Sequence, residues 1–130
     1  MKRTDVLKRS IAACLSVVLF HAAFSAEPTL DRLQLKRQLP GNTIRYEAPG
    51  EVIHEFLALD GTIHGQSSVH GRYRGHWRLH ENDLFCFEHD DPMQSGCVAV
   101  VLRGSQIEYH RRDGIVEGPF EFIAGNPEYL

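Results

Sequence analysis

The sequence lacks the motifs by which many enzymes are identified. Gly65–Val69 (GQSSV) has no second glycine where the G-x-S-x-G nucleophile turn requires one. His54–Leu59 (HEFLAL) begins like the zinc motif H-E-x-x-H, but Ala58 occupies the place of the second histidine. A phosphate-binding loop, a dinucleotide fingerprint and a zinc-deaminase signature are also missing. The sequence therefore predicts a protein that is not an enzyme, and it indicates no cofactor.

Long apolar segments are missing as well. The run Ile11–Phe20 has ten residues, whereas a membrane-spanning helix needs about 20. It follows basic residues and precedes small ones, an order typical of a secretory signal peptide. We expect residues 1–25 to be this peptide, cleaved after Ser25 or, alternatively, after Ala26. Residues 26–130 would then form one secreted domain, periplasmic or extracellular, with no transmembrane span.

Cys14 leaves a lipoprotein alternative open, because Ile11–Cys14 (IAAC) loosely matches a lipobox. However, most of the apolar run follows this cysteine, so a lipid attached there would leave an apolar segment on the mature chain. The signal peptide is the favoured interpretation, with Cys14 as a small apolar residue inside it.

Positive charge is scarce in the predicted mature chain. The full chain has 14 Lys and Arg, of which four lie in residues 1–25, and 17 Asp and Glu, of which one lies there. Residues 26–130 therefore have a formal charge of −6 (10 minus 16). A negative domain lacks the basic footprint of non-specific nucleic-acid binding, so no nucleic-acid partner is expected. Histidines are plentiful, and they make the net charge sensitive to mildly acidic pH.

Cysteine is also rare, and only Cys86 and Cys97 remain after residue 25. They do not form a C-x-x-C redox pair. In an oxidising compartment an even pair predicts a disulfide, and a hairpin folded about Asp91–Pro92 would place the two cysteines directly opposite each other. A closed loop of about 12 residues would stabilise the fold by about 3 kcal/mol.

One helix is expected, over Thr29–Gln38, with Thr29 as its N-cap, Leu30 and Leu33 on one face, and an end at Leu39-Pro40-Gly41. The rest of the chain is divided by turn residues into short segments typical of strands. These segments are Asn42–Glu47, Glu51–Leu59, Thr62–Gly65, Arg72–His80, Leu84–His89, Cys97–Arg103, Gln106–Arg111 and Ile115–Ile123. The pattern predicts an all-β fold: an antiparallel meander forming a small barrel or curled sheet with one short N-terminal helix. A β-sandwich is the alternative.

The segment Arg72–His80 alternates between two kinds of side chain over its whole length. One face carries the predicted core anchors Tyr73, Trp77 and Leu79. The other face carries Arg72, Arg74, His76, Arg78 and His80, which we interpret as a solvated basic stripe and a speculative site for an anionic ligand or partner. On a strand, His76 and His80 are about 13 Å apart, too far to bind one metal ion together.

The following hairpin loop is acidic and contains His89, Asp90 and Asp91. Such oxygen-rich loops can hold a cation, so these three residues form a speculative metal site, although EF-hand spacing is missing. An exposed acidic loop is the favoured interpretation.

Several short motifs occur in an order that resembles a family. They are LPGNT (Leu39–Thr43), LDGTIHG (Leu59–Gly65), YRGHWRLHENDLFCF (Tyr73–Phe87), GCVAV (Gly96–Val100), RRDG (Arg111–Gly114) and GNPEYL (Gly125–Leu130). Most of residues 29–130 resemble a group of small secreted proteobacterial proteins with a domain of unknown function, in which an Asp-Gly turn, Gly-x-Trp, Leu-x-Cys and a second Cys follow one another. The resemblance implies an all-β periplasmic domain with Cys86 and Cys97 joined, and it carries no catalytic residues.

The sequence thus favours an exported, non-enzymatic β-domain that binds a protein partner or a small ligand in the cell envelope. Two alternatives remain open. One is a histidine-based metal-binding protein. The other is a small hydrolase or isomerase, which would need a deep pocket that holds a histidine beside a carboxylate.

Overall fold

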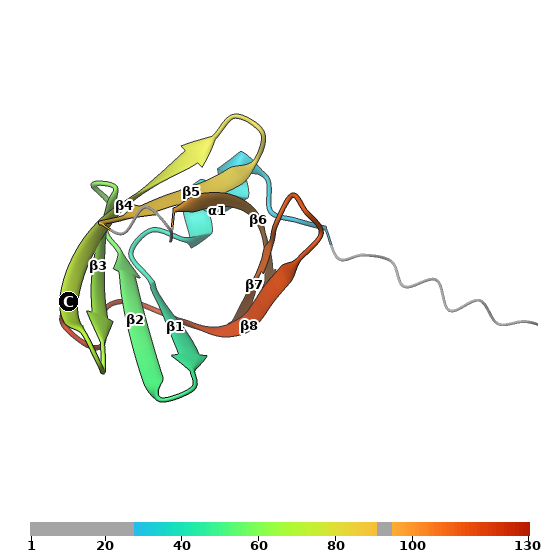
Figure 1. Ribbon diagram of the computed structural model, residues 1–130. Coiled ribbons are helices and arrows are strands. Elements are labelled where there is room, and N and C mark those ends of the chain that lie inside the picture. Colours follow the sequence, from blue (N-terminus) through green and yellow to red (C-terminus); the bar gives the residue numbers. More distant parts are fainter. Residues whose placement is uncertain (1–27, 91–94) are drawn as a thin grey trace, which may run out of the picture.

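The computed structural model describes residues 28–90 and 95–130, so the predicted signal peptide, Cys14 and Asp91 lie outside the described residues. The described residues form one helix and eight strands (Figure 1). The elements are α1 (Arg32–Gln38), β1 (Thr43–Ala48), β2 (Glu51–Leu57), β3 (Thr62–Ser67), β4 (Gly71–His80), β5 (Leu84–His89), β6 (Gly96–Arg103), β7 (Gln106–His110) and β8 (Val116–Ile123). In this part of the chain, no helix is long and apolar enough to span a membrane.

The strands form a closed antiparallel barrel in chain order. Each strand pairs with the next one, and β1 pairs with β8 through registers such as Ile44↔Phe122, which closes the ring. The predicted all-β meander is confirmed, and it takes the barrel form instead of the β-sandwich. Among the described residues, each strand pairs with a neighbour on both sides, so the sheet has no edge strand.

The N-terminal helix differs from the prediction at its start. Its N-cap is Asp31, whose carboxylate accepts a hydrogen bond from the Gln34 backbone amide at 2.8 Å, while the Gln34 side chain accepts one from the Asp31 amide at 2.9 Å. This reciprocal capping box satisfies two amides that would otherwise have no partner, so Thr29 is not the cap. The predicted Leu30–Leu33 face is also wrong, because Leu33 is 55% exposed and Leu30 precedes the helix, with its amide bonded to the carbonyl of Val100.

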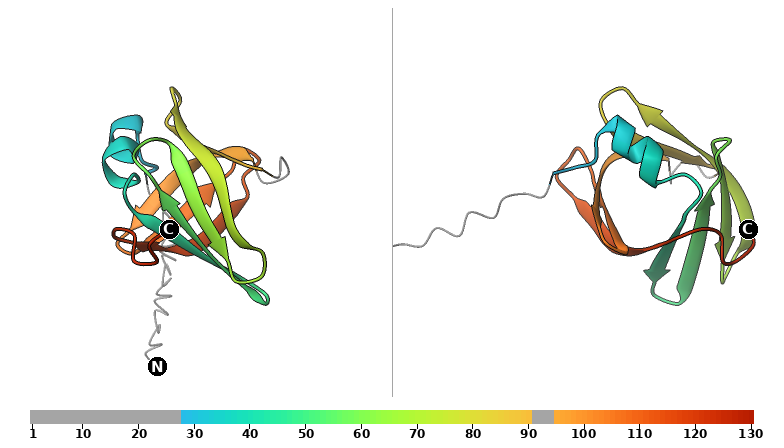
Figure 2. Two further views of the ribbon diagram at one scale, coloured as in Figure 1. Left: turned by 90° about the vertical axis from the view of Figure 1, so that its left-hand side faces the viewer. Right: turned by 180° about the vertical axis from the view of Figure 1, so that it is seen from behind.

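Helix α1 lies across one end of the barrel, which Figure 1 places behind the strands and the rear view of Figure 2 places in front of them. Leu35 and Leu39 are fully buried at this end, and the Arg32 amide donates to Asp83 Oδ1 in the β4–β5 turn at 2.8 Å. The two leucines pack with inward-facing strand residues of the same apolar core, which include Ile44, Leu57, Ile63, Phe85, Val100 and Ile107. We refer to this helix-covered end as the closed end.

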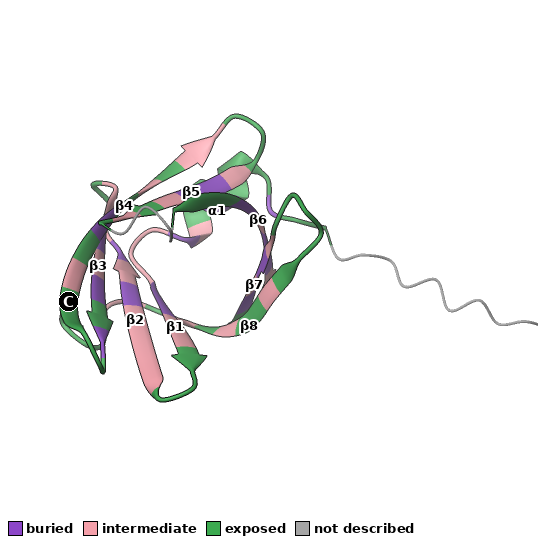
Figure 3. Cartoon of the chain, in the orientation of Figure 1, coloured by how far each residue is buried: buried purple, intermediate pink, exposed green. Residues whose placement is uncertain are grey.

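Burial changes from residue to residue along the strands, as expected for a barrel with an inner and an outer face (Figure 3). On β4, Tyr73, Trp77 and Leu79 point inward as predicted, and the indole Nε1 of Trp77 donates to the carbonyl of Ala58 at 2.8 Å. Toward the other end of the barrel, polar side chains join the apolar ones in the interior. The hairpins β1–β2 and β7–β8 lie at this second end, which we call the open end.

Candidate ligand-binding site

A buried carboxylate lies in the interior toward the open end. Glu55 points inward from β2, and only 7% of its surface is exposed. Its Oε1 accepts a hydrogen bond from the Tyr73 hydroxyl at 2.5 Å and lies 2.8 Å from His89 Nε2. Its Oε2 accepts from the Tyr46 hydroxyl at 3.1 Å. A carboxylate loses much hydration free energy on burial unless donors surround it. The hydroxyls of Tyr73 on β4 and Tyr46 on β1 are donors to Glu55, and His89 on β5 lies within ion-pair distance of it.

Two glycines in the barrel wall make room for this arrangement. Gly65 on β3 lies opposite Tyr73 on β4, and a Cβ at position 65 would collide with the Tyr73 ring. Gly75 on β4 lies opposite His89 on β5, and a Cβ there would come within 2.9 Å of His89 Cδ2. Each glycine therefore leaves room for a ring from the neighbouring strand, and both rings reach Glu55.

A third hydroxyl extends the network toward the open end. Tyr109 on β7 has its hydroxyl oxygen 2.8 Å from that of Tyr46. Burial first, and the negative charge of Glu55 second, raise the pKa of Tyr46 and Tyr73 well above the usual value. Burial also raises the pKa of Tyr109, and it is the largest cause of that shift. All three phenols are therefore protonated over the physiological pH range, and each has one proton to donate.

The network forms part of the wall of a cavity of about 770 Å³. Aromatic rings make the apolar part of this wall: Phe87 stacks on Tyr109 with ring centroids 6.1 Å apart, and Phe120 meets Tyr109 edge-on at 5.3 Å. The lining residues are Tyr46, Ile53, Glu55, Phe87, His89, Ser95, Gly96, Cys97, Val98, Tyr109, Arg111, Arg112, Asp113, Glu117 and Phe120. The volume and the mixture of apolar walls with a few convergent polar groups are typical of small-molecule sites.

Charged residues of the β7–β8 hairpin surround the mouth of the cavity. Arg111 forms ion pairs with Asp113 at 3.0 Å and with Glu117 at 3.1 Å. These contacts occupy the guanidinium with residues of its own hairpin, so the mouth presents a nearly balanced set of charges.

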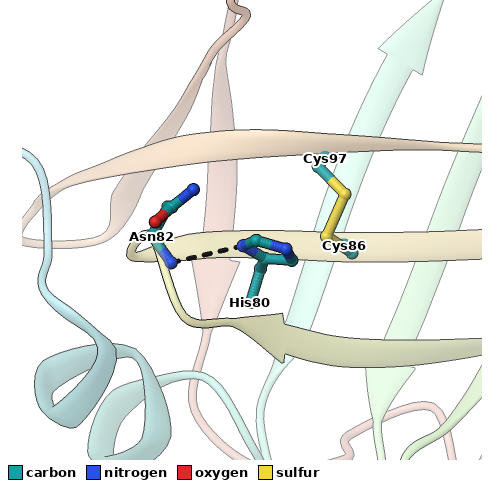
Figure 4. The surroundings of a disulfide bond; sticks show 4 residues. All are labelled: His80, Asn82, Cys86 and Cys97. Atoms are coloured by element: carbon teal, nitrogen blue, oxygen red, sulfur yellow. Dashed lines mark hydrogen bonds between the residues drawn. A yellow bond between two sulfur atoms is a disulfide. The ribbon is translucent and has the colours of Figure 1, made fainter.

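The predicted disulfide is confirmed, and it closes the wall beside the cavity. Cys86 and Cys97 are directly opposite each other on β5 and β6, with their sulfurs 2.04 Å apart (Figure 4). Cys97 also contacts the cavity, together with Gly96 and Val98. The covalent bond thus joins the strand that carries His89 to a strand that lines the site.

The predicted basic stripe lies on the outer face of the barrel, away from this cavity. Arg72, Arg74, His76 and Arg78 are exposed, whereas His80 is half-buried and its Nδ1 accepts a hydrogen bond from the Asn82 amide at 3.2 Å, the contact drawn in Figure 4. The stripe does not meet the interior network, so an anionic partner at this surface stays a prediction.

The residues of the speculative metal site do not all face the same way. His89 points into the barrel toward Glu55, Asp90 is exposed, and Asp91 lies outside the described residues. Over residues 28–90 and 95–130, no three His, Cys, Asp or Glu side chains are grouped so that they could hold a metal ion.

The sequence interpretation singled out Tyr73 only as a core anchor and His89 only as a residue of the speculative metal site, and it selected neither Tyr46, Glu55 nor Tyr109 as a site residue. A usable signal was present: Gly65 and Gly75 interrupt strands that alternate in polarity, and a glycine within a strand often marks a place where another group approaches the backbone closely.

Searches against protein families, curated proteins and solved structures found no match to this chain. The resemblance to small secreted proteobacterial proteins therefore stays a prediction.

Proposed function

We propose that this protein is exported and binds a small, largely apolar molecule inside its barrel. The observation that carries the proposal is the cavity of about 770 Å³, whose aromatic walls converge on the buried Glu55 network. An apolar cavity favours desolvated ligands, and a few fixed polar groups orient them. Export is supported by the disulfide, which persists in oxidising compartments.

Calorimetric titration with 2-naphthol, a flat neutral probe, tests this proposal. Gly96 lines the mouth, and a Cβ there would lie 3.8 Å from the Phe87 ring, so the large side chain in Gly96→Trp should fill the cavity and abolish binding. Gln66→Trp, which places the same side chain at an exposed position of β3, is the matched control and should bind like the wild type. Equal binding by both variants would place the probe elsewhere and contradict the proposal.

Endogenous ligand offers an independent test. Native mass spectrometry of the protein, purified without denaturation, should show a mass adduct that Gly96→Trp lacks and Gln66→Trp retains.

A second candidate is acid–base catalysis by His89, because the structure places a histidine beside a carboxylate at the wall of a cavity. In that case Glu55 would hold the imidazole and stabilise its protonated form, and His89 would exchange the proton with a substrate. With a substrate identified by screening, His89→Gln should lower kcat at least 100-fold with little change in KM. Turnover unchanged in this variant would rule out His89 as the acid–base group.

A further inference from the structure

We infer that the cavity selects a flat apolar ligand with a hydroxyl or amino group, which donates a hydrogen bond to the Tyr109 oxygen. The inference rests on the proposed ligand-binding function and adds the chemical class of the ligand. It follows from the way in which protons are distributed along the chain of groups Glu55, Tyr46 and Tyr109.

The direction of the hydrogen bonds begins at the carboxylate, because an ionised carboxylate can only accept. Tyr46 donates its single hydroxyl proton to Glu55 Oε2 at 3.1 Å. The 2.8 Å contact between Tyr46 and Tyr109 must then use the proton of Tyr109. With its proton committed, Tyr109 has only oxygen lone pairs left to offer to a ligand.

The surroundings of Tyr109 define the rest of the ligand. Its ring belongs to the cavity wall, stacked on Phe87 and met edge-on by Phe120. A flat apolar body fits against these rings, and its donor group reaches the phenol oxygen. A ligand with only acceptors would face the Tyr109 lone pairs without a proton between the two oxygens. A carboxylate ligand would in addition share the cavity with Glu55 and Glu117.

The same argument predicts that one substitution reverses the preference. Glu55 Oε1 faces both the Tyr73 hydroxyl and His89 Nε2, so in Glu55→Gln the amide oxygen should take that place and the NH2 group should face Tyr46. Tyr46 then accepts from the amide and donates its own proton to Tyr109. Tyr109 in turn donates to the ligand, and the site prefers an acceptor.

The experiment compares two probes with the same ring system by calorimetry: 2-naphthol, which can donate, and 2-methoxynaphthalene, which can only accept. The wild type should bind 2-naphthol about tenfold more tightly, the effect of one buried hydrogen bond. Tyr109→Phe should bind the two probes equally, and Glu55→Gln should prefer 2-methoxynaphthalene. Tyr129→Phe removes an 87% exposed tyrosine that does not line the cavity and should keep the wild-type ratio.

The outcomes distinguish ligand binding in the cavity from the preference for a ligand that donates a hydrogen bond. If neither probe binds the wild type, ligand binding in this cavity fails and the inference fails with it. If both probes bind the wild type with equal affinity, or if Tyr109→Phe keeps the tenfold ratio, the inference alone is overturned. Should Glu55→Gln fail to fold, as judged by circular dichroism, the ratio in Tyr109→Phe still decides the matter.

Discussion

The two ends of the barrel are built from different chemistry. At the closed end, α1 covers an apolar core, and residues such as Leu35, Leu39 and Ile107 are fully buried. At the open end, a nearly buried carboxylate accepts hydrogen bonds from tyrosines and faces a histidine. Replacing buried ionic groups by well-packed apolar residues is often neutral or stabilising. Stability alone therefore explains the closed end but not the open one, for which the proposed ligand binding would supply a reason.

The largest expected effect is at the closed end. Leu35→Ala should lower the free energy of unfolding by about 4 kcal/mol, because it removes a fully buried side chain and leaves a cavity. Urea denaturation measures the change, and Leu33→Ala, at a 55% exposed position of the same helix, should change stability by less than about 0.5 kcal/mol. The folded Leu35→Ala protein should bind 2-naphthol with unchanged affinity. A large loss of affinity would mean that the two ends are not independent.

A slightly smaller loss of stability is expected when the disulfide in the wall of the open end is removed. Replacing both Cys86 and Cys97 by alanine should lower the free energy of unfolding by about 3 kcal/mol, because the unfolded chain regains the freedom of the closed loop. Thermal unfolding with and without reductant provides the comparison: reductant should destabilise the wild type and leave the variant unchanged. If complete reduction left the unfolding temperature of the wild type unchanged, the disulfide would not stabilise the fold.

The smallest of the three effects is a loss of stability at alkaline pH that originates at the open end. Tyr46, Tyr73 and Tyr109 keep their protons in the folded state, because burial raises their pKa values. The unfolded chain releases those protons above pH about 10, so stability is fully present below that pH and falls as the pH rises. By pH about 10.5 the loss should reach about 2 kcal/mol, mostly from Tyr46 and Tyr109, with a smaller share from the more exposed Tyr73.

Urea titrations at several pH values check this effect. In Tyr109→Phe the alkaline loss should shrink by roughly two fifths, the share of one of the two fully buried phenols. A loss of the same size in the variant and in the wild type would assign the alkaline sensitivity to other groups.

Much of the barrel could be predicted from the sequence, because turn residues and alternating polarity act locally. Asp60-Gly61 separates β2 from β3, and Arg72–His80 alternates in and out as expected. The prediction failed at the start of α1, where Thr29 and Asp31 are both possible caps and Gln34 decides in favour of Asp31. Closure into a barrel was left undecided because it depends on the pairing of β1 with β8, which are far apart in the chain.

The candidate site could not be predicted in the same way. Glu55, Tyr73, His89 and Tyr109 come from four strands, and no spacing rule links residues that meet only through cross-strand register. His89 illustrates the difficulty: its neighbour Asp90 is exposed and belongs to an acidic loop, whereas the pleat of β5 turns His89 inward. Only Gly65 and Gly75, which lie opposite Tyr73 and His89, indicated in the sequence that large side chains pack against the barrel wall.

The most direct test of the contrast between the two ends is a titration of the ¹⁵N-labelled protein with 2-naphthol, followed by backbone amide chemical shifts. We expect the shift changes to gather around Phe87, Tyr109 and Phe120 at the open end, with little change around Leu35 and Leu39. Changes centred on the closed end, or on the exposed outer residues Arg74 and Arg78, would contradict a ligand site inside the open end of the barrel.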